Sequence, residues 1–581
     1  MNGLPEEETG SFLVLERRLG LSPWLAKPIE ENRWLYARVL LAAALINIFA
    51  IFTSLYTMTV YDRVIPTSAY ASLIGLTIGL VIIIVFDFII KGLRAYFVDV
   101  AGSRIDQRVG REIFAKILSM RLDQRRGSIG GLSAIVREVD TIRDFMASAT
   151  ITALVDVPFI FLTLLVIALI GGSVVWVPII LIPVVLLIGL ALQPALRAQS
   201  SQLLGNSLSK HAVLVEAIGS LETVKVAGAG PMLDMRYDGA VERHSAVSLR
   251  QRIISNLGIN SAMSAQSLCY AGVVFVGVFK IADQSMTMGA LIACSILAGR
   301  AVAPLTQIAQ LLTRVHSARS AYKQIDALME QPDERSTPGL SVPMLLEGGI
   351  EFRDVDFRYP DAAELALRNV NLRINPGEHV ALIGPIGSGK STIAKLITGL
   401  YEPASGLVLV DGIDIRQMEP TTFRSKVGTL LQDNSLLTGT IRDNIRLGRS
   451  EDDEELMRVS QIAGAHDFIA TLPHGYDLRL SDRGEGLSGG QRQSIALARA
   501  MYGSPPIMVL DEPTSAIDTD TEAAVVNRLK EELSGRTLIL VTHRPSLLAL
   551  VDRVILMSRG RVVVDGPPDQ IAQKISLLKA R

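Results

Sequence analysis

One stretch, residues 376–392, constrains the fold of this chain more than any other. The apolar run from Val380 to Ile383 predicts a buried strand, and Thr392 to Ile397 predicts the start of a helix. Between them lies Gly384-Pro-Ile-Gly-Ser-Gly-Lys-Ser391, which fits the pattern GxxxxGK[ST] of a phosphate-binding loop. A simple glycine-rich turn is the alternative interpretation, but the full pattern between a strand and a helix favours a nucleoside triphosphate site.

The residue types of this loop predict how it would bind the phosphates. Glycines let backbone N–H groups turn toward a triphosphate, and the helix N-terminus adds a positive dipole end. Lys390 would reach the β- and γ-phosphates, and the Ser391 hydroxyl would ligate Mg²⁺. The expected nucleotide contacts in this loop are Gly384, Gly387, Ser388, Gly389, Lys390, Ser391 and Thr392.

A second apolar run, Ile507-Met-Val-Leu-Asp-Glu512, predicts a strand that ends in two acids. A strand-end aspartate can hold Mg²⁺ through water, and the adjacent glutamate can polarise an attacking water. The motif is weak alone but strong downstream of a phosphate-binding loop. We therefore expect Asp511 to act in metal binding and Glu512 in catalysis.

The pentapeptide Leu487-Ser-Gly-Gly-Gln491 precedes a predicted helix from Arg492 to Tyr502. Its serine hydroxyl and glycine N–H groups would lie at a positive helix N-terminus, which makes a second anion site. A helix cap alone would explain the serine and the glycines, but not the whole pentapeptide together with the two acids.

The first half of the chain predicts a membrane domain. Hydrophobic residues make up 49% of the sequence and its mean hydropathy is +0.35, which is high for a soluble protein. A net charge of -1 gives no indication of a nucleic-acid partner. Six apolar stretches approach the roughly 20 residues that a bilayer requires. They are residues 38–60, 70–92, 148–171, 173–193, 257–281 and 286–306.

The intervals between these stretches predict the topology. Residues 93–147 and 194–256 are long, rich in Arg and Lys, and patterned as helices, so we expect helices that continue into the cytoplasm. Both termini would then lie inside. Asp87 and Asp156 fall inside apolar stretches, where a carboxylate serves either a transport pathway or a structural hydrogen bond near a helix end. Cys269 and Cys294 are interpreted as buried small side chains, since they suggest neither a disulfide nor a metal site.

The remaining segments complete the predicted organisation. Residues 1–36 form an N-terminal segment without a cleavable signal peptide, and its Trp24 and Trp34 indicate either an interfacial segment or an ordinary loop. Residues 37–320 form the six-span domain. Residues 321–347 form a linker containing the helix-breaking run 331–339. Short apolar runs alternating with helical patterns in residues 348–581 predict a soluble α/β domain.

With these motifs in place, the sequence resembles the ABC transporter family over essentially its whole length. The resemblance implies a membrane all-α six-helix exporter domain followed by an α/β P-loop ATPase domain, with ATP and Mg²⁺ as cofactors. It implies catalytic roles for Glu512, His543 and Gln432. Further implied roles are metal contacts from Ser391, Gln432 and Asp511, adenine stacking on Tyr359, and nucleotide contacts from Ser488, Gly489, Gly490 and Asp518. The segment containing Asp518 has Ile517 where the family usually has leucine.

Because the chain carries one membrane domain and one nucleotide domain, the resemblance implies a half-transporter that works as a homodimer. ATP would lie between Lys390 of one copy and Ser488 of the other. Two segments, Gly130 to Asp140 and Ile218 to Lys225, resemble the cytoplasmic coupling regions of the exporters. A solvated helix-turn is the alternative for both. The segment 482–486 resembles a loop that touches the membrane domain, but it lacks an arginine often found there.

Two further motifs, Val60 to Pro66 and Leu154 to Phe159, resemble the ATPases of type I secretion. That resemblance implies export of an unfolded protein from the bacterial inner membrane, with the nucleotide domain in the cytoplasm. Expected partners are a periplasmic membrane fusion protein, an outer-membrane channel and the protein substrate. We expect no N-terminal peptidase-like domain, because about 36 residues precede the first span and such a domain needs more.

Two alternatives to protein secretion remain at this point. One is an exporter of lipid, glycolipid or a drug-like molecule with the same architecture. The other is a membrane-anchored nucleotide sensor without transport, against which the presence of both Glu512 and His543 argues.

Overall fold

The computed structural model describes residues 21–124, 129–146, 149–334, 346–360, 362–432 and 435–571. Parts of the predicted N-terminal segment, third span, linker and α/β domain lie outside these residues. The chain forms two compact units. The helical unit comprises Met1–Leu118 and Arg126–Gln331, and the α/β unit comprises Ser119–Arg125 and Pro332–Arg581.

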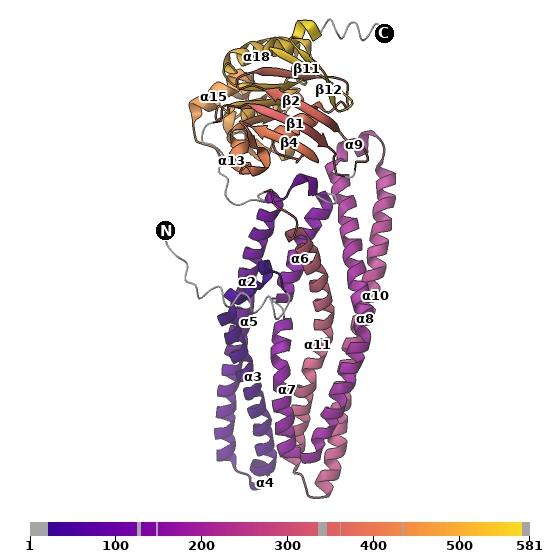
Figure 1. Ribbon diagram of the computed structural model, residues 1–581. Helices are drawn as coiled ribbons and strands as arrows, with labels where there is room; N and C mark the ends of the chain where they lie inside the picture. Colours follow the sequence, from indigo (N-terminus) through magenta and orange to yellow (C-terminus); the bar gives the residue numbers. More distant parts are fainter. Residues whose placement is uncertain are drawn as a thin grey trace. The chain divides into compact units, whose positions relative to one another are not determined.

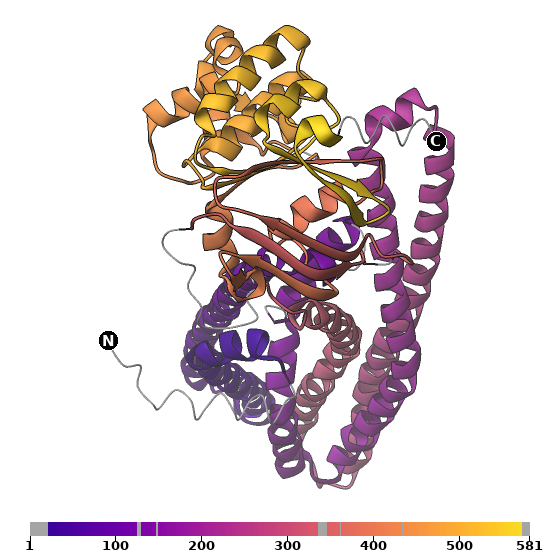
Figure 2. The same cartoon turned by 45° about the horizontal axis from the view of Figure 1, so that its top comes forward.

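The helical unit consists of long helices joined by short turns (Figure 1). Its elements are α2 (Pro23–Glu31), α3 (Arg33–Thr59), the π-helix η2 (Val60–Val64), α4 (Ile65–Thr67), α5 (Tyr70–Ser119), α6 (Ile129–Met146), α7 (Ala149–Gly171), the 3₁₀ turn η4 (Gly172–Val175), α8 (Trp176–Gly219), α9 (Leu221–Val226), α10 (Gly230–Ala282) and α11 (Met288–Met329). Helices α8 and α10 run side by side in both views (Figures 1 and 2).

Apart from one to three residues at an end, the described parts of the six predicted apolar stretches lie in these long helices, namely α3, α5, α7, α8, α10 and α11. Five helical stretches of the described residues are long and apolar enough to cross a membrane. One of them, Asp156–Gly219, covers most of the third predicted span and all of the fourth, because η4 joins α7 to α8 without a break. The prediction of a six-helix membrane domain is therefore confirmed.

Helix α5 shows why this unit requires a membrane. Its most apolar 18-residue window has no buried residue in this chain, and Phe86 and Phe88 are 53% and 78% exposed. Water would disfavour such a surface, so lipid or a partner must cover it. The helix has 50 residues, or roughly 75 Å, about two and a half times the thickness of the bilayer core. It therefore continues well beyond the membrane, as the long basic intervals predicted.

The two acids within apolar stretches both make ion pairs, one between helices and one within a helix. Asp156 of α7 lies 3.4 Å from Arg94 of α5 and accepts a hydrogen bond from Asn47 of α3 at 3.2 Å. It thus ties three helices together. Asp87 accepts from Lys91, one turn later on the same helix, at 2.6 Å.

The two cysteines and the two predicted interfacial tryptophans differ in burial. Cys269 and Cys294 are fully buried, as expected for small core side chains. Trp24 lies in helix α2 rather than in a loop. It is buried against α11, where it stacks on Tyr322 and donates to Asp326 at 3.0 Å. Trp34 is 72% exposed, as an interfacial tryptophan would be.

The Val60 to Pro66 motif has a local structural purpose. Its Asp62, in η2, accepts hydrogen bonds from the Thr287 hydroxyl at 2.6 Å and the Gly289 N–H at 2.8 Å. Thr287 is the N-cap of α11 and Gly289 lies in its first turn, whose N–H groups have no partner within the helix. Asp62 therefore caps α11 from another helical segment.

The α/β unit contains three sheets and a set of covering helices. Its strands are β1 (Ile350–Phe357), β2 (Leu367–Ile374), β3 (His379–Ile383), β4 (Ser405–Val410), β5 (Ile413–Asp414), β6 (Val427–Leu430), β7 (Gly439–Thr440), β8 (Arg479–Leu480), β9 (Ile507–Asp511), β10 (Thr537–Val541), β11 (Arg553–Ser558) and β12 (Arg561–Gly566). Its α-helices are α12 (Lys390–Ile397), α13 (Pro420–Ser425), α14 (Ile441–Arg446), α15 (Asp453–Ile462), α16 (His466–Thr471), α17 (Gly489–Met501) and α18 (Thr519–Glu532). Short 3₁₀ turns are η3 (Leu122–Gln124), η5 (Ile415–Gln417), η6 (Gly475–Asp477), η7 (Asp482–Gly484) and η8 (Pro545–Leu550).

The six-stranded sheet, in the order β12-β11-β3-β10-β9-β6, has both faces buried. Side chains alternate along β10: Leu538 and Leu540 enter one core, whereas Ile539 and Val541 enter the other. The first core contains residues of α14, α15, α17 and α18, and the second contains α12 and the sheet β2-β1-β4-β5. Burial on both faces explains the uninterrupted apolar runs in the sequence.

Four parallel strands of this sheet place the predicted site residues at one edge. β3 and β9 both pair with β10, and β6 pairs with β9, all in parallel. Val541 lies opposite both Leu382 and Asp511. Because parallel strands end at the same edge, the segments that follow them converge there. The α/β fold predicted from the sequence is therefore confirmed, including the strand–loop–helix order at the phosphate loop.

Three predicted segments differ from the structure. Helix α17 begins at Gly489, not Arg492, because Ser488 caps it. Helix α11 continues to Met329, past the predicted start of the linker at residue 321. The first predicted coupling region, Gly130 to Asp140, lies in α6 of the helical unit, whereas the segment grouped with the α/β unit is Ser119–Arg125. The arginine-rich pattern spans both segments and did not separate them.

Candidate functional site

The loop after β3 is shaped by a glycine that no other residue could replace. Gly384 has a φ of 146°, and a Cβ there would lie 2.2 Å from the Met557 carbonyl oxygen of β11. The loop ends at Gly389, the N-cap of α12, so that Lys390, Ser391 and Thr392 form the first turn of the helix. Backbone N–H groups of a first helical turn are free to bind an anion.

Lys390 is buried in this loop. Its ammonium donates to the carbonyl oxygens of Gly384 at 2.8 Å and Pro385 at 2.9 Å, and lies 3.4 Å from the Ser388 hydroxyl. Burial lowers the pKa of Lys390, against the opposing attraction of Asp511 and Glu512. A buried cation thus lies beside free N–H groups, an arrangement suited to phosphate.

Asp511 lies at the end of β9 and is 3% exposed. Burial raises the pKa of its carboxyl, while a hydrogen bond from the Ser391 hydroxyl and the charge of Lys390 lower it. A hydroxyl and a carboxylate oxygen therefore lie side by side at the start of the phosphate-loop helix. Hard oxygen donors of this kind suit Mg²⁺, which usually takes one or two protein ligands and keeps several waters.

Glu512 adopts a left-handed backbone conformation, with φ of 52°. This conformation is uncommon for a residue with a side chain. It is held by a bond from the Glu512 N–H to the Val541 carbonyl at 2.8 Å. The carboxylate accepts a hydrogen bond from the backbone N–H of His543 at 3.1 Å. His543 comes shortly after the end of β10, and its side chain is exposed. Two adjacent strands therefore bring Glu512 and His543 together.

Tyr359 lies in an aromatic cluster next to the same helix. Its hydroxyl is 3.1 Å from the Thr392 hydroxyl, and its ring meets those of Phe357 and Tyr401 edge-on, with centroids 4.9 and 5.4 Å away. The Lys395 ammonium lies 5.5 Å from the ring centroid. The ring is half-buried and thus retains a free surface.

The pentapeptide Leu487 to Gln491 forms the N-terminus of α17. Ser488 and Gln491 make a capping box, in which each side chain accepts from the other residue's N–H at 3.2 and 2.9 Å. Gly490 is required by close packing, because a Cβ there would lie 2.7 Å from the Ala516 carbonyl. Ser488 and Gly489 stay exposed.

Gln493 is a connecting residue that the sequence reasoning missed. Its amide donates to the Glu512 carbonyl at 2.6 Å and to the Ser515 hydroxyl at 3.1 Å, and its oxygen accepts from the Ala516 N–H at 2.7 Å. It therefore joins α17 to the segment after Glu512. The sequence shows only a glutamine two positions after Gln491, which by itself does not predict these contacts.

A second missed group joins the segment after Glu512 to the segment after His543. Glu522 of α18 is 5% exposed and accepts from Thr514 at 2.9 Å, Ser546 at 2.7 Å and Arg544 at 2.5 Å. Arg544 also donates to the Ser515 carbonyl at 2.9 Å. These bonds fix the loops that carry Glu512 and His543.

The structure thus gathers most predicted residues at one sheet edge. The phosphate loop, Asp511, Glu512 and His543 lie there, and exposed Gln432 follows β6 at the same edge. Asp518 instead caps α18 by accepting from the Thr521 N–H at 3.0 Å. Within the described residues, no hydrogen bond or ion pair joins Ser488, Gly489 or Gly490 to the phosphate loop.

Comparisons with known protein families match both halves of the chain. The model described as "ABC transporter transmembrane region" matches residues 36–304, and the model described as "ABC transporter" matches residues 367–515. The two matches correspond to the helical unit and to most of the α/β unit.

Two similar curated proteins are the leukotoxin translocation ATP-binding proteins LktB of Mannheimia haemolytica and Bibersteinia trehalosi. Each is 32% identical over 554 residues, which is 95% of this chain and 78% of the relative. A solved structure described as a bacterial Atm1-family ABC exporter with ATP bound is similar in fold. Its TM-score is 0.82 at 23% identity, over 93% of this chain and 96% of that one.

Proposed function

The chain belongs to the ABC transporter family, and on this premise we propose that it is an ATP-driven exporter for type I secretion of an unfolded protein. Membership in the family carries nucleotide binding and ATP hydrolysis coupled to transport, in a multi-pass membrane protein. The observation that carries the finer proposal is the 32% identity over 95% of the chain to a leukotoxin translocation protein.

The geometry supports a specific division of labour for ATP. Lys390 and the first turn of α12 bind the β- and γ-phosphates, because a buried ammonium and free N–H groups meet there. Glu512 polarises the attacking water and His543 holds the γ-phosphate, since the two lie together at the strand ends. Tyr359 offers the free surface of its ring to the adenine. Gln432, just after β6, would sense the nucleotide from the same edge.

Mg²⁺ fits the oxygen donors at this edge. Ser391 and Asp511 would hold the ion, and Gln432, which follows β6 at the same sheet edge, would join them. When bound, the ion neutralises phosphate charge during phosphoryl transfer.

The exposed N-terminus of α17 supports a homodimer. Ser488 and Gly489 are exposed, and among the described residues no hydrogen bond or ion pair joins them to the chain's own phosphate loop, although they form a helix N-terminus suited to an anion. In our proposal, Ser488 to Gly490 of one copy close over ATP bound to Lys390 of the other, with Asp518 nearby. Each of the two ATP sites then needs both copies.

The proposed setting is the bacterial inner membrane, with the nucleotide domain in the cytoplasm. The basic residues of the long intervals 93–147 and 194–256 support this orientation. Protein secretion across two membranes would require a periplasmic membrane fusion protein and an outer-membrane channel as partners. The exported protein is the substrate.

The test is a comparison of culture media from three strains: one with the gene deleted, one complemented with the wild type, and one with an empty vector. If the proposal is correct, mass spectrometry finds one or a few large proteins that disappear on deletion and return on complementation. An unchanged set of secreted proteins, with altered membrane lipids or drug tolerance, would contradict it and favour lipid or small-molecule export.

A further inference from the structure

Arg300 is a charged side chain inside a membrane helix, α11, and it is exposed. It lies in the apolar stretch Met288–Leu305, of which 61% is buried inside the helical unit. The most apolar windows of the other four candidate membrane stretches are 28% buried or less. Because α11 is so enclosed, an exposed side chain on it indicates an opening beside the helix.

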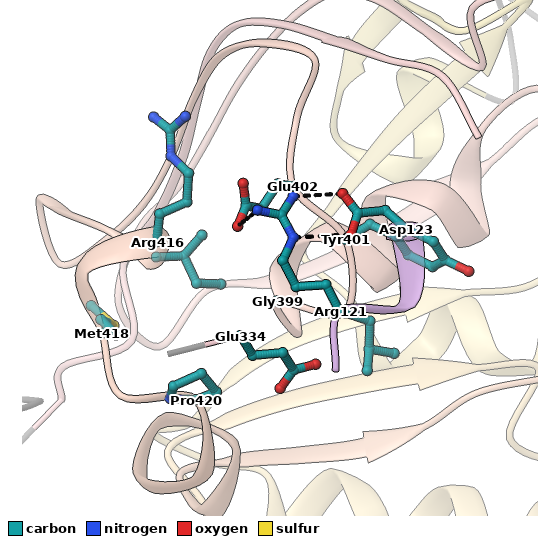
Figure 3. A pocket seen from close by; sticks show the side chains of 11 residues that line it. Arg121, Asp123, Glu334, Gly399, Tyr401, Glu402, Arg416, Met418 and Pro420 are labelled. Atoms are coloured by element: carbon teal, nitrogen blue, oxygen red, sulfur yellow. Dashed lines mark hydrogen bonds and ion pairs between the residues drawn. The ribbon is translucent and has the colours of Figure 1, made fainter. Parts of the chain in front are cut away.

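Arg300 has no acidic partner among the described residues, unlike arginines elsewhere in the chain. In the α/β unit, Arg121 lies between two carboxylates (Figure 3), and Arg424 makes a bidentate pair with Glu334. The two acids inside the apolar stretches are already paired with other cations. A guanidinium at membrane depth is costly unless it faces water or an anion. The opening beside Arg300 therefore contains water or an anionic group.

A stripe of exposed polar side chains runs along the neighbouring helix α10. Its members recur at intervals of four, four and three residues, so they share one face of the helix. They are Asn256, Asn260, Ser264 and Ser267. We call them the polar stripe. Buried residues of α10, such as Ala262 and Cys269, lie on the opposite face. The stripe therefore points away from the packed side of its own helix.

The polar stripe has little to bond with inside the chain. Among the described residues, the side chains of Asn256, Asn260 and Ser264 make no hydrogen bond, and Ser267 donates only to the Met263 carbonyl of its own helix, at 3.3 Å. Amide and hydroxyl groups without partners are strongly disfavoured in hydrocarbon. Lipid chains are therefore a poor covering for this face.

Contacts with α8 place the stripe beside an apolar part of that helix. Gln251 donates to Ser200 of α8 at 3.3 Å, and a Cβ at Gly272 would lie 2.8 Å from the Val177 side chain of α8. Between these contacts, the stripe lies level with the part of α8 that contains Leu187, which is 64% exposed. One depth thus holds an apolar exposed face on α8, suited to lipid, and a polar exposed face on α10.

Arg300 and the polar stripe lie at the same depth on adjacent helices. Gln266, which precedes Ser267, donates to the Gly299 carbonyl of α11 at 3.5 Å, and Gly299 precedes Arg300. The amides and hydroxyls of the stripe can donate hydrogen bonds to a peptide backbone and accept them from it. The guanidinium prefers carboxylates. Together these groups suit an extended polypeptide that carries acidic side chains.

We propose that Arg300 and the polar stripe form a water-facing surface within the membrane that contacts the exported polypeptide and favours its acidic segments. The inference rests on the proposed function and assigns a contact surface to its cargo. Charge complementarity selects this occupant over a second copy of the chain, because the predicted apolar stretches contain only two acids, Asp87 and Asp156, and both are paired.

The first test measures water access with thiol reagents on the full-length protein in lipid nanodiscs. Ser264→Cys and Ser267→Cys each add a thiol to the stripe, and Leu187→Cys adds one to the apolar face of α8 as a matched control. The wild type, whose two cysteines are buried, is the blank. The probe is a sulfonate-bearing methanethiosulfonate, and intact mass spectrometry follows the reaction. Both stripe thiols should react at least roughly tenfold faster than Leu187→Cys, because the reactive thiolate forms in water and not in lipid.

The second test measures the preference for anions in the Ser267→Cys protein. The rate with the sulfonate reagent is divided by the rate with a trimethylammonium-bearing one. Arg300→Gln should lower this ratio by roughly tenfold, because the local positive field is lost, whereas Arg300→Lys should retain it. Arg319→Gln is the control, since this exposed arginine of α11 lies about 28 Å along the helix, beyond the reach of screened charge.

The third test measures export in the deletion strain at equal membrane levels of transporter. Arg300→Glu should lower the amount of the export-dependent protein in the medium by roughly tenfold, because a like charge repels acidic segments. Arg300→Lys and Arg319→Gln should restore it.

Three results would overturn the inference. Stripe thiols as unreactive as Leu187→Cys would show that lipid or a second copy covers the stripe. A charge ratio unchanged by Arg300→Gln would remove the anion preference, and normal export with Arg300→Glu would remove the contact with cargo. In each case the proposed export function stands. If the wild type exports no protein, the proposed function falls and the cargo assignment with it, whereas the thiol reactions still decide whether the surface faces water.

Discussion

Glu512 has a backbone conformation that is uncommon for a residue with a side chain. Its left-handed backbone is held by the Val541 carbonyl, and its carboxylate accepts the His543 N–H. Residues held in sparsely populated backbone conformations concentrate at functional sites, where the surrounding structure supports them. The arrangement therefore fits a carboxylate fixed to orient a water beside a bound phosphate.

Replacing this carboxylate tests its role directly. We expect Glu512→Gln to lower ATP turnover about 100-fold or more, because the amide cannot accept a proton from water. ATP affinity should change little, since Lys390 and the first turn of α12 remain. Steady-state phosphate release and equilibrium nucleotide binding measure the two quantities. Glu454→Gln, an exposed change in the first turn of α15, is the control. Unchanged turnover in Glu512→Gln would refute the catalytic assignment.

At the level of elements, the N-terminus of α17 is positioned by a close contact with the segment after Glu512. Gly490 allows it, because a Cβ would lie 2.7 Å from the Ala516 carbonyl. The neighbouring Gly489 faces only the Ala516 methyl, at an ordinary 3.6 Å. The two glycines therefore offer a matched pair in one helical turn.

We expect Gly490→Ala to destabilise the protein by about 1–3 kcal/mol through overpacking against backbone. Gly489→Ala should cost less than about 1 kcal/mol, since no atom must move. Thermal unfolding of the purified protein in detergent compares the two. A larger loss for Gly489→Ala than for Gly490→Ala would show that the packing around Ala516 is described incorrectly.

The cap on α11 makes a second prediction for an element. Asp62→Ala leaves the Gly289 N–H and the Thr287 hydroxyl without their acceptor, which should cost about 1 kcal/mol, as for other N-caps. Asp62→Asn keeps an acceptor oxygen and should lose less. The midpoint of thermal unfolding in detergent reports both. Equal midpoints for the wild type and Asp62→Ala would remove the cap from this account.

The sequence predicted elements where one local rule decides them, and failed where a tertiary contact does. Both faces of the central sheet are buried, so strands such as Thr537–Val541 appeared as plain apolar runs with correct ends. The strand-end acids and the phosphate loop were also predicted correctly in sequence order, because each is defined by a local motif next to such a strand. Gln493 and Arg424 could not be predicted, because their partners, such as the Glu512 carbonyl and Glu334, are distant in sequence and carry no motif.

At the scale of the whole molecule, the proposal that each ATP site spans two copies makes a prediction about mixed dimers. A Lys390→Ala dimer and a Ser488→Arg dimer each have both sites damaged, the first by a lost phosphate cation and the second by a bulky cation at the helix N-terminus. A mixed dimer of the two variants concentrates both lesions in one site and leaves the other intact. Purified mixed dimers, isolated with two different tags, should therefore recover ATP turnover.

If they are as inactive as either parent, either the site does not span two copies or one site cannot work alone. Heterodimers of wild type with the double variant separate these cases, because they keep one intact site only if each site lies within a single copy. Turnover in them would show that the site does not span two copies, whereas a site that spans two copies leaves both of their sites damaged and the heterodimer inactive.

The central claim is that ATP hydrolysis at this site drives protein export, and one comparison tests it most directly. In the deletion strain, the export-dependent protein is quantified in the medium after complementation with wild type, Glu512→Gln or Glu454→Gln, at equal membrane levels of the transporter. The account predicts that wild type and Glu454→Gln restore the secreted protein, and that Glu512→Gln leaves it inside the cell. Normal secretion with Glu512→Gln, at a turnover shown to be lost in vitro, would contradict the claim.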